Sequence, residues 1–224
     1  KKIEFNNKII FKNITFSYEE NIILKNVSLE FNKGEKIGIY GDSGAGKSTF
    51  LDILSGLISP QIGEVLVDGQ NINLNLQSWQ KKISYLSQST ILIDDTIKNN
   101  ILMGDKDNYD SRLYDNCIKD VKLDTFINNL KDKDSTIIGE RGAKISGGQK
   151  QRIGLARIIC LNRDVLILDE STNAIDEENE EEILKKIWKL YKHKTIIIVS
   201  HNKKNLSNCD SVYKFENYKL IKFN

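Results

Sequence analysis

Nine consecutive residues, Gly41 to Thr49, carry the clearest chemical pattern in this sequence. They read Gly-Asp-Ser-Gly-Ala-Gly-Lys-Ser-Thr and match the spacing G-x-x-x-x-G-K-[S/T] of a phosphate-binding loop. An apolar run at 37–40 precedes the loop, and apolar residues recur at helical spacing behind it: Phe50, Ile53, Leu54 and Leu57. The loop is therefore expected to join a buried strand to a helix whose free N-terminal N–H groups face an anion. We interpret it as a binding site for a polyphosphate.

Each residue type in the loop suits this chemistry. Three glycines let the backbone come close to the phosphates: Gly41, Gly44 and Gly46. We expect Lys47 to neutralise charge on the β- and γ-phosphates, Ser48 to ligate Mg²⁺, and Thr49 to add a hydrogen bond to phosphate. The alternative is a glycine-rich turn that binds nothing, which the agreement of loop, lysine, hydroxyl and flanking elements disfavours. The loop alone does not name a reaction.

Two further apolar runs end in residues that could act on the same phosphates. The run 165–168 ends in Asp169 and Glu170, and His201 lies two residues beyond the run 195–199. Continuous apolar runs predict buried parallel strands, and doubly wound sheets hold ligands at the carboxyl ends of such strands. Asp169 is expected to orient the Mg²⁺ shell, Glu170 to polarise water for in-line attack, and His201 to contact the γ-phosphate. An acidic pair that only caps the next helix is the simpler alternative for the two carboxylates.

Two single residues extend this prediction with weaker signals. Gln88 follows a short apolar strand at 83–86, and its amide could reach the metal or a water from a mobile loop. Tyr18 closes the strand predicted at 9–18; it is either an ordinary aromatic at a strand end or a ring stacked on a purine. Only a wider pattern can decide between these interpretations.

The remaining elements must position these residues. The strand predicted at 9–18 is followed by another at 27–31, and Asp68-Gly69 separates strands at 64–67 and 72–74 as in a hairpin. These four segments predict an antiparallel subdomain. Roughly 91–160 reads as a helical insertion, with amphipathic helices around two groups of apolar residues: Leu113, Tyr114, Cys117, Ile118 and Val121, then Phe126, Ile127 and Leu130.

The acidic run 176–182 is interpreted as the exposed start of a helix and not as a metal site. Acidic residues suit a helix N-terminus, and Glu181 with Lys185 and Glu182 with Lys186 have the spacing of ion pairs.

Composition bounds the class of protein. The 224 residues suit one sizeable domain, and a formal charge of +2 with scattered basic residues gives no strong field for nucleic acid. Cys117, Cys160 and Cys209 form no C-x-x-C pair, which favours plain thiols in a reducing compartment. No apolar run approaches the ~18 residues of a membrane span. The chain starts at Lys1 and its only methionine is Met103, so we expect a fragment of a longer polypeptide.

Residues 145–152, Ile-Ser-Gly-Gly-Gln-Lys-Gln-Arg, together with the phosphate-binding loop resemble the signature of the ATP-binding cassette (ABC) family. The resemblance covers the whole chain. Tyr18 falls where that family has its adenine-stacking aromatic, Gln88 at its Q-loop and His201 at its switch histidine. Asp169-Glu170 falls at its Walker B motif and Ala174-Ile175-Asp176 at its D-loop.

The resemblance implies a nucleotide-binding domain that works as a head-to-tail dimer, with each ATP between one subunit's loop and the other's signature. Ser146, Gly147 and Gly148 would open a helix whose dipole faces the partner's γ-phosphate. The segments 94–104 and 139–142 resemble the exporter branch, which implies a transmembrane domain upstream of Lys1. The sequence departs from the family pattern at three positions outside the expected contacts with ATP: Ile145, Asn173 and Asn202.

The expected fold class is α/β: a P-loop NTPase core with a mostly parallel sheet, an N-terminal antiparallel β subdomain and an inserted α-helical subdomain. Within a single domain spanning 1–224, the antiparallel part is expected at 1–35 and 62–76, the core at 36–60, 77–90 and 160–224, and the helical part at 91–159. The expected activity is ATP hydrolysis that powers an exporter or flippase at the cytoplasmic face of the membrane, with ATP and Mg²⁺ as cofactors. A soluble cassette ATPase that acts on nucleic acid or ribosomes, and a nucleotide-gated binding module without turnover, are the alternatives.

The predicted site residues fall into three groups. Those expected to bind nucleotide are Tyr18, Gly41, Asp42, Ser43, Gly44, Ala45, Gly46, Lys47, Ser48, Thr49, Ser146, Gly147, Gly148 and Gln149. Those expected to act in catalysis are Lys47, Gln88, Glu170 and His201. Those expected to hold the metal are Ser48, Gln88 and Asp169.

Overall fold

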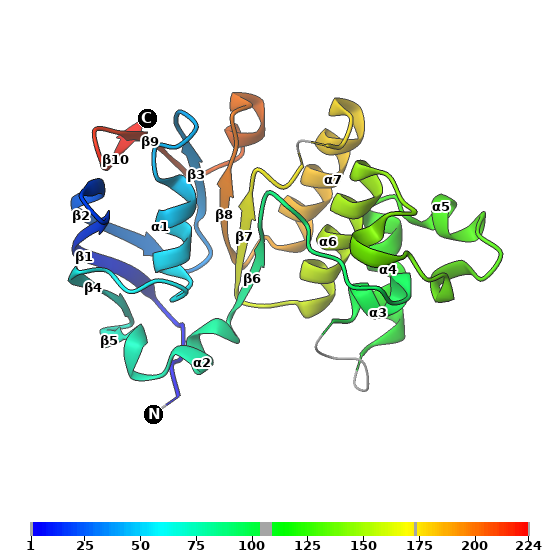
Figure 1. Cartoon of the computed structure of the whole chain (residues 1–224). Helices are drawn as coiled ribbons and strands as arrows, with labels where there is room; N and C mark the ends of the chain where they lie inside the picture. Colours follow the sequence, from blue (N-terminus) through cyan, green and yellow to red (C-terminus); the bar gives the residue numbers. More distant parts are fainter. Residues whose placement is uncertain (1, 104–108, 173, 224) are drawn as a thin grey trace. The chain divides into compact units, whose positions relative to one another are not determined.

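The computed structural model describes residues 2–103, 109–172 and 174–223, and these form two compact units (Figure 1). The first unit takes its residues from 1–84, 163–169 and 191–224, and the second from 85–162 and 170–190.

The prediction of 72–74 as a strand was wrong, because these residues form the 3₁₀ turn η1 (Ile72–Leu74). The Asn71 side chain caps that turn by accepting a hydrogen bond from the Asn73 N–H group, and this local bond competes with strand pairing.

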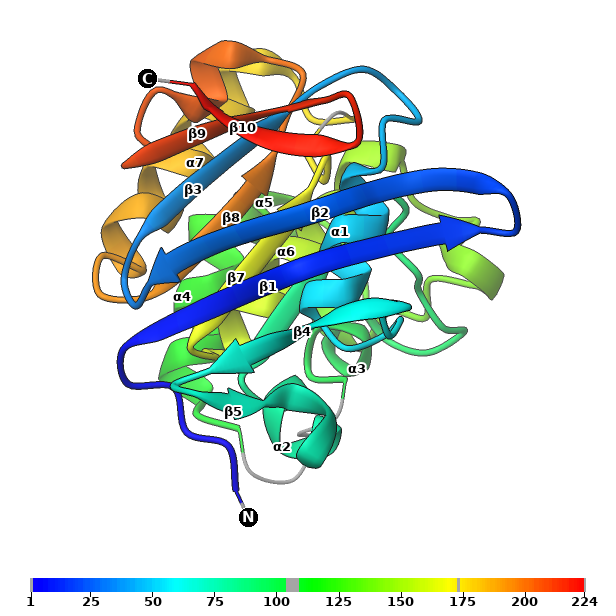
Figure 2. The ribbon, with the colours of Figure 1, turned by 90° about the vertical axis from the view of Figure 1, so that its left-hand side faces the viewer.

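A four-stranded antiparallel sheet opens the first unit, in the order β2-β1-β4-β5 (Figure 2). Its strands are β1 (Lys8–Tyr18), β2 (Asn21–Asn32), β4 (Ile62–Val67) and β5 (Gln70–Asn71). Apolar residues of β1 recur with a period of about two and are buried: Ile9, Phe11, Ile14 and Phe16. The Asp68 carboxylate accepts hydrogen bonds from the N–H groups of Asn6, Asn7 and Lys8, which fixes the start of β1.

The second sheet has six strands in the order β10-β9-β3-β8-β7-β6. They are β3 (Lys36–Tyr40), β6 (Ile83–Leu86), β7 (Val165–Asp169), β8 (Thr195–Val199), β9 (Ser211–Glu216) and β10 (Lys219–Phe223). The pairs β3–β8, β3–β9 and β7–β8 are parallel, whereas β9–β10 is antiparallel. Every residue of β7 and β8 is buried, as expected for the centre of a parallel sheet. The predicted α/β fold class is confirmed.

Helix α1 (Lys47–Leu54) packs its apolar face into the first unit. The Phe50 ring stacks on Phe11 of β1 at 4.6 Å between ring centroids and meets Phe31 of β2 edge to face at 6.3 Å. The short helix α2 (Leu76–Gln80) adds Trp79, which donates a hydrogen bond from Nε1 to the Leu54 carbonyl at 2.8 Å. The prediction that Leu57 continues the apolar face of the helix was wrong, because α1 ends at Leu54 and Leu57 is 62% exposed.

The second unit is helical: α3 (Ile97–Ile101), α4 (Ser111–Asp120), α5 (Asp124–Asn128), α6 (Gly147–Leu161) and α7 (Glu177–Leu190). Buried Asn100 accepts a hydrogen bond from the Ile93 N–H group and donates to the carbonyls of Ile93 and Thr96, which ties α3 to the segment before it. Arg157 of α6 donates to the carbonyls of Asn100 and Ile91 at 2.8 and 3.0 Å, and burial lowers the pKa of its guanidinium. These bonds hold α6 against α3.

Helix α7 begins with the acidic run. Glu181 and Lys185 form the expected ion pair at 2.6 Å. Glu182 instead pairs with Lys122, and Lys186 pairs with Asp120 at 3.8 Å. Tertiary neighbours therefore replace the second i, i+4 pair.

Among the described residues, no helix combines the length and the apolar character needed to cross a membrane.

Candidate nucleotide site

The loop 41–49 connects β3 to α1 in a conformation that only glycine adopts easily at one key position. Gly46 has φ +111, and a Cβ atom there would lie 2.6 Å from Ile23 Cγ2 and 2.9 Å from Phe215 Cζ. Gly46 is also the N-cap of α1, and no side chain caps the helix at this point. An anion is therefore the fitting partner for the N–H groups of the first turn, as expected for a polyphosphate.

Lys47 points its ammonium group back into the loop. Its Nζ donates to the carbonyls of Gly41 and Asp42, both at 2.8 Å, and the residue is only 6% exposed. The cation is thus held within the curve of the loop, where a triphosphate would meet it.

Ser48 and Asp169 meet although 121 positions separate them in the sequence. Ser48 Oγ donates a hydrogen bond to Asp169 Oδ2 at 2.9 Å. Asp169 ends β7, is 4% exposed, and lies opposite Val199 of β8 in the parallel register. A hydroxyl and a carboxylate side by side are the hard oxygen donors that Mg²⁺ takes when phosphate and water complete its shell. These residues therefore fit the cation predicted from the sequence.

His201 belongs to the same edge of the parallel sheet as Asp169. It follows β8 two residues after Val199, and its side chain is exposed. His201 also lines a pocket beside the loop.

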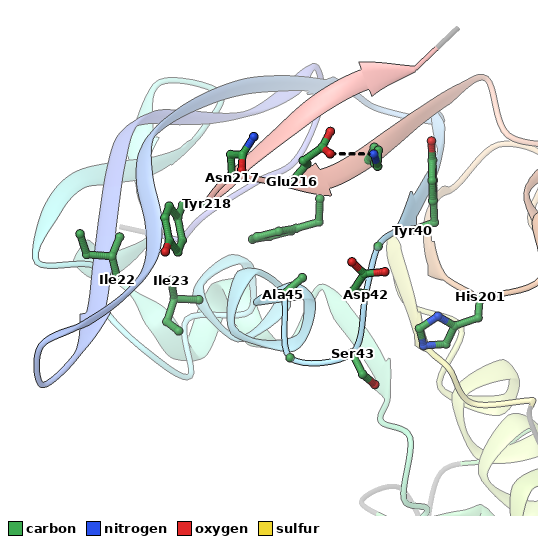
Figure 3. A pocket seen from close by; sticks show the side chains of 14 residues that line it. Ile22, Ile23, Tyr40, Asp42, Ser43, Ala45, His201, Glu216, Asn217 and Tyr218 are labelled. Atoms are coloured by element: carbon green, nitrogen blue, oxygen red, sulfur yellow. Dashed lines mark hydrogen bonds and ion pairs between the residues drawn. The ribbon is translucent and has the colours of Figure 1, made fainter.

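That pocket, of about 700 Å³, runs along the front half of the loop (Figure 3). Its walls include five residues of the loop, 41–45, together with His201 and residues that sequence reasoning did not single out: Ile22, Ile23, Tyr40, Lys214, Phe215, Glu216, Asn217 and Tyr218. Lys214 and Glu216 form an ion pair at 2.9 Å, and this hydrogen bond raises the pKa of Lys214. Among these residues, only the pair Asn217-Tyr218 carries a sequence signal, because asparagine is common in turns. That signal could have marked this side of the pocket.

Tyr18 is not among the residues that line this pocket. It lies at the end of β1, is 47% exposed, and packs edge to face on Phe16 at 4.9 Å between centroids. Its register partner is Asn21, so the hairpin that carries Tyr18 also carries Ile22 and Ile23. Its role as a stacking ring stays a prediction.

Glu170 and Gln88 meet in the second unit. Gln88 Nε2 donates a long hydrogen bond to Glu170 Oε2 at 3.4 Å. Glu170 has φ +47, a left-handed conformation that is uncommon for a residue with a side chain and frequent at functional sites. The amide of one predicted catalytic residue therefore lies next to the carboxylate of another.

The predicted signature residues form the N-terminus of α6. Ser146 is the N-cap; its Oγ accepts from the Gln149 N–H group at 3.2 Å, and Gln149 Oε1 accepts from the Ser146 N–H group at 2.9 Å. This is a complete capping box, so the Gln149 side chain stabilises the helix end. Gly147 and Gly148 follow as the first two helical residues, so these two positions of α6 carry no side chain.

Residues after the predicted Walker B motif pack against the same helix end. A Cβ atom at Gly148 would lie 3.1 Å from the Ala174 carbonyl oxygen. The Ala174 N–H group donates to Gln151 Oε1 at 2.8 Å, a contact that sequence reasoning missed because the two residues lie 23 positions apart. Asn173, one of the three departures from the family pattern, lies outside the described residues, as does Gly104 of the predicted exporter segment.

Comparisons with known proteins agree with this geometry. A family model described as ABC transporter matches residues 24–173. The ATP-dependent lipid A-core flippase of Pasteurella multocida (strain Pm70) is 38% identical over 209 residues, which are 92% of this chain and 36% of that protein. The leukotoxin translocation ATP-binding protein LktB of Mannheimia glucosida is 36% identical over 221 residues, 97% of this chain and 31% of that protein.

A solved structure extends the likeness to three dimensions. The structure of a bacterial Atm1-family ABC exporter with ATP bound matches with a TM-score of 0.93 and 32% identity over 98% of this chain and 39% of that chain. The chain spans about a third of the length of the curated relatives it matches.

Proposed function

This chain belongs to the ABC transporter family, and we propose that it binds and hydrolyses ATP to drive an exporter or flippase. The observation that carries the proposal is the 2.9 Å hydrogen bond between Ser48 Oγ and Asp169 Oδ2 beside a phosphate-binding loop. This bond joins Ser48, which follows Lys47 of the loop, to Asp169, the last residue of the buried strand β7. It therefore brings two hard oxygen ligands to one place.

In this proposal the loop binds the triphosphate. The N–H groups at the start of α1 and the Lys47 ammonium group attract the phosphates, and Ser48 with Asp169 would hold Mg²⁺. The bound cation would neutralise charge on the β- and γ-phosphates and orient the γ-phosphate for in-line displacement.

Glu170 is the proposed general base. Its carboxylate takes a proton from the attacking water while the neighbouring Gln88 amide donates a hydrogen bond and keeps the side chain oriented. His201, at the carboxyl edge of β8, is proposed to contact the γ-phosphate.

The signature residues supply the other half of each site in a head-to-tail dimer. Ser146, Gly147 and Gly148 open a helix of 15 residues, so its N–H groups and dipole favour an anion. The capping box uses the Gln149 N–H group, which leaves the N–H groups of the two glycines for a phosphate. We propose that this phosphate belongs to ATP held by the partner's loop.

The relatives supply the wider setting of the proposal. They are named as a flippase and as a leukotoxin translocation ATP-binding protein, and each extends well beyond the matched part. We propose that this domain works at the cytoplasmic face of a membrane, coupled to a transmembrane domain that is encoded upstream of Lys1 in the same polypeptide.

A dilution series tests the two-subunit mechanism. Specific ATPase activity of the 224-residue chain should rise with protein concentration in the dilute range, because the active dimer forms by mass action. A specific activity that does not change with concentration would contradict the composite site, and no Mg²⁺-dependent ATP hydrolysis at any concentration would contradict the proposed function itself.

A further inference from the structure

We propose that Tyr218, in the turn between β9 and β10, contacts the nucleoside part of the bound nucleotide. This inference rests on the proposed function, since it assumes that ATP lies along the pocket beside the loop. It adds an aromatic contact from the C-terminal hairpin to the one predicted at Tyr18.

The first observation is that Tyr218 occupies a backbone position that suits glycine. The register pairs Glu216 with Lys219, so Asn217 and Tyr218 form a two-residue loop. Their φ angles are +50 and +63, as in a type I′ turn, where Asn-Gly is the favoured pair. A bulky aromatic at positive φ is strained, and such strain concentrates at sites where the side chain has a function.

The second observation is where the side chain lies. Tyr218 is 50% exposed and lines the pocket together with Ile22 and Ile23 of β2. The Tyr218 carbonyl accepts a hydrogen bond from the Lys25 N–H group at 3.0 Å, which ties the turn to β2. Figure 3 shows Tyr218, Ile22 and Ile23 at one end of the pocket and Ser43 and His201 at the other.

The two ends of this pocket differ in chemistry. The end formed by the loop offers N–H groups to phosphate, whereas the end formed by Tyr218, Ile22 and Ile23 offers an aromatic ring and aliphatic carbons. A nucleoside is the part of ATP that carries flat apolar surface, and stacking on an aromatic ring tolerates every base. Tyr218 is therefore expected to add affinity for nucleosides without choosing between bases.

Calorimetric titration of the 224-residue chain with Mg-ATP, Mg-GTP and Mg-tripolyphosphate tests the inference. Tyr218→Gly should weaken ATP and GTP about tenfold, because it removes one stacking partner, and should leave tripolyphosphate unchanged. Its thermal unfolding midpoint without ligand should be unchanged or higher, because glycine suits the turn. Tyr218→Phe should keep the wild-type affinity for ATP. Tyr218→Asn should weaken ATP and GTP binding as Tyr218→Gly does, because asparagine also tolerates this backbone conformation.

Lys133→Gly is the matched control. Lys133 also has positive φ, at +46, but belongs to the second unit and not to the pocket. It should leave ATP affinity unchanged. Equal ATP affinity of wild type, Tyr218→Gly and Tyr218→Asn would overturn the inference, as would an equal loss of ATP and tripolyphosphate. A wild-type chain that binds no ATP would instead overturn the proposed function.

Discussion

Replacement of Glu170 by glutamine is expected to lower the rate of ATP hydrolysis while changing the stability of the fold little. The change keeps the shape of the side chain and an oxygen that can still accept the Gln88 hydrogen bond, but it removes the carboxylate that we propose takes a proton from water. Glutamine inherits the same left-handed backbone at φ +47, so the strain at this position is unchanged. The substitution therefore isolates the proton acceptor.

The two expected effects differ widely in size. Loss of a general base lowers the hydrolysis rate by about 10²- to 10⁴-fold, which is about 2.7 to 5.5 kcal/mol in the activation barrier. The Gln88 to Glu170 contact is an exposed hydrogen bond at 3.4 Å, so its weakening should change the free energy of unfolding by less than about 1 kcal/mol. ATP affinity should change little, because the loop and Lys47 are intact.

Single-turnover hydrolysis of radiolabelled ATP gives the rate, and urea denaturation of the same preparation gives the free energy of unfolding. Size-exclusion chromatography with Mg-ATP should show an ATP-bound dimer that accumulates in Glu170→Gln. The control is Glu178→Gln, the same chemical change at an exposed residue in the first turn of α7, which should keep the wild-type rate.

Two results would refute this reasoning. A rate within threefold of wild type would show that Glu170 is not the base. A loss of unfolding free energy as large as the rise in the barrier would show that Glu170 acts through the structure and not on water.

Three further predictions follow from other contacts. Lys47→Ala should weaken ATP binding about tenfold or more by calorimetry, since the ammonium held in the loop is the proposed main countercharge to the phosphates; near-normal affinity would contradict this role of Lys47. Ser146→Arg should bind ATP almost normally yet lose turnover, and mixing it with Lys47→Ala should restore at most one composite site per heterodimer; full activity of Ser146→Arg alone would argue against a shared site. Lys36→Met should lower the free energy of unfolding, measured in urea, by about 3 kcal/mol, because the carbonyls of Gly34, Lys192 and Lys194 lose the hydrogen bonds that Lys36 Nζ donates. A change below about 1 kcal/mol would show that water replaces the lysine as the donor.

Local sequence determined the elements whose hydrogen bonds and burial repeat over short distances. The glycine spacing of the loop, the apolar runs of β3, β7 and β8, and the Ser146 and Gln149 capping box all lie within a few neighbouring residues. Each could be read from the sequence because a strand, a helix start or a tight loop depends on nearby residue types.

Local signals failed where a tertiary neighbour or a competing local bond decided the outcome. Residues 72–74 have the apolar pattern of a strand, but the side chain of Asn71 caps a 3₁₀ turn there. Leu57 has helical spacing, yet the helix ends before it. Glu182 pairs with Lys122, which lies 60 positions away, and not with the residue one turn along its own helix.

The tertiary structure alone decided which distant residues share a site. Ser48 meets Asp169 because the order β3-β8-β7 places the loop after β3 close to the end of β7, and no local periodicity encodes that order. The pocket likewise gathers Ile22 from one hairpin and Tyr218 from another, and the hydrogen bond from the Lys25 N–H group to the Tyr218 carbonyl joins these hairpins. Contacts of this kind depend on how sheets and helices pack, because the free energy of burying apolar surface is shared over the whole core and is not specific to any one segment of sequence.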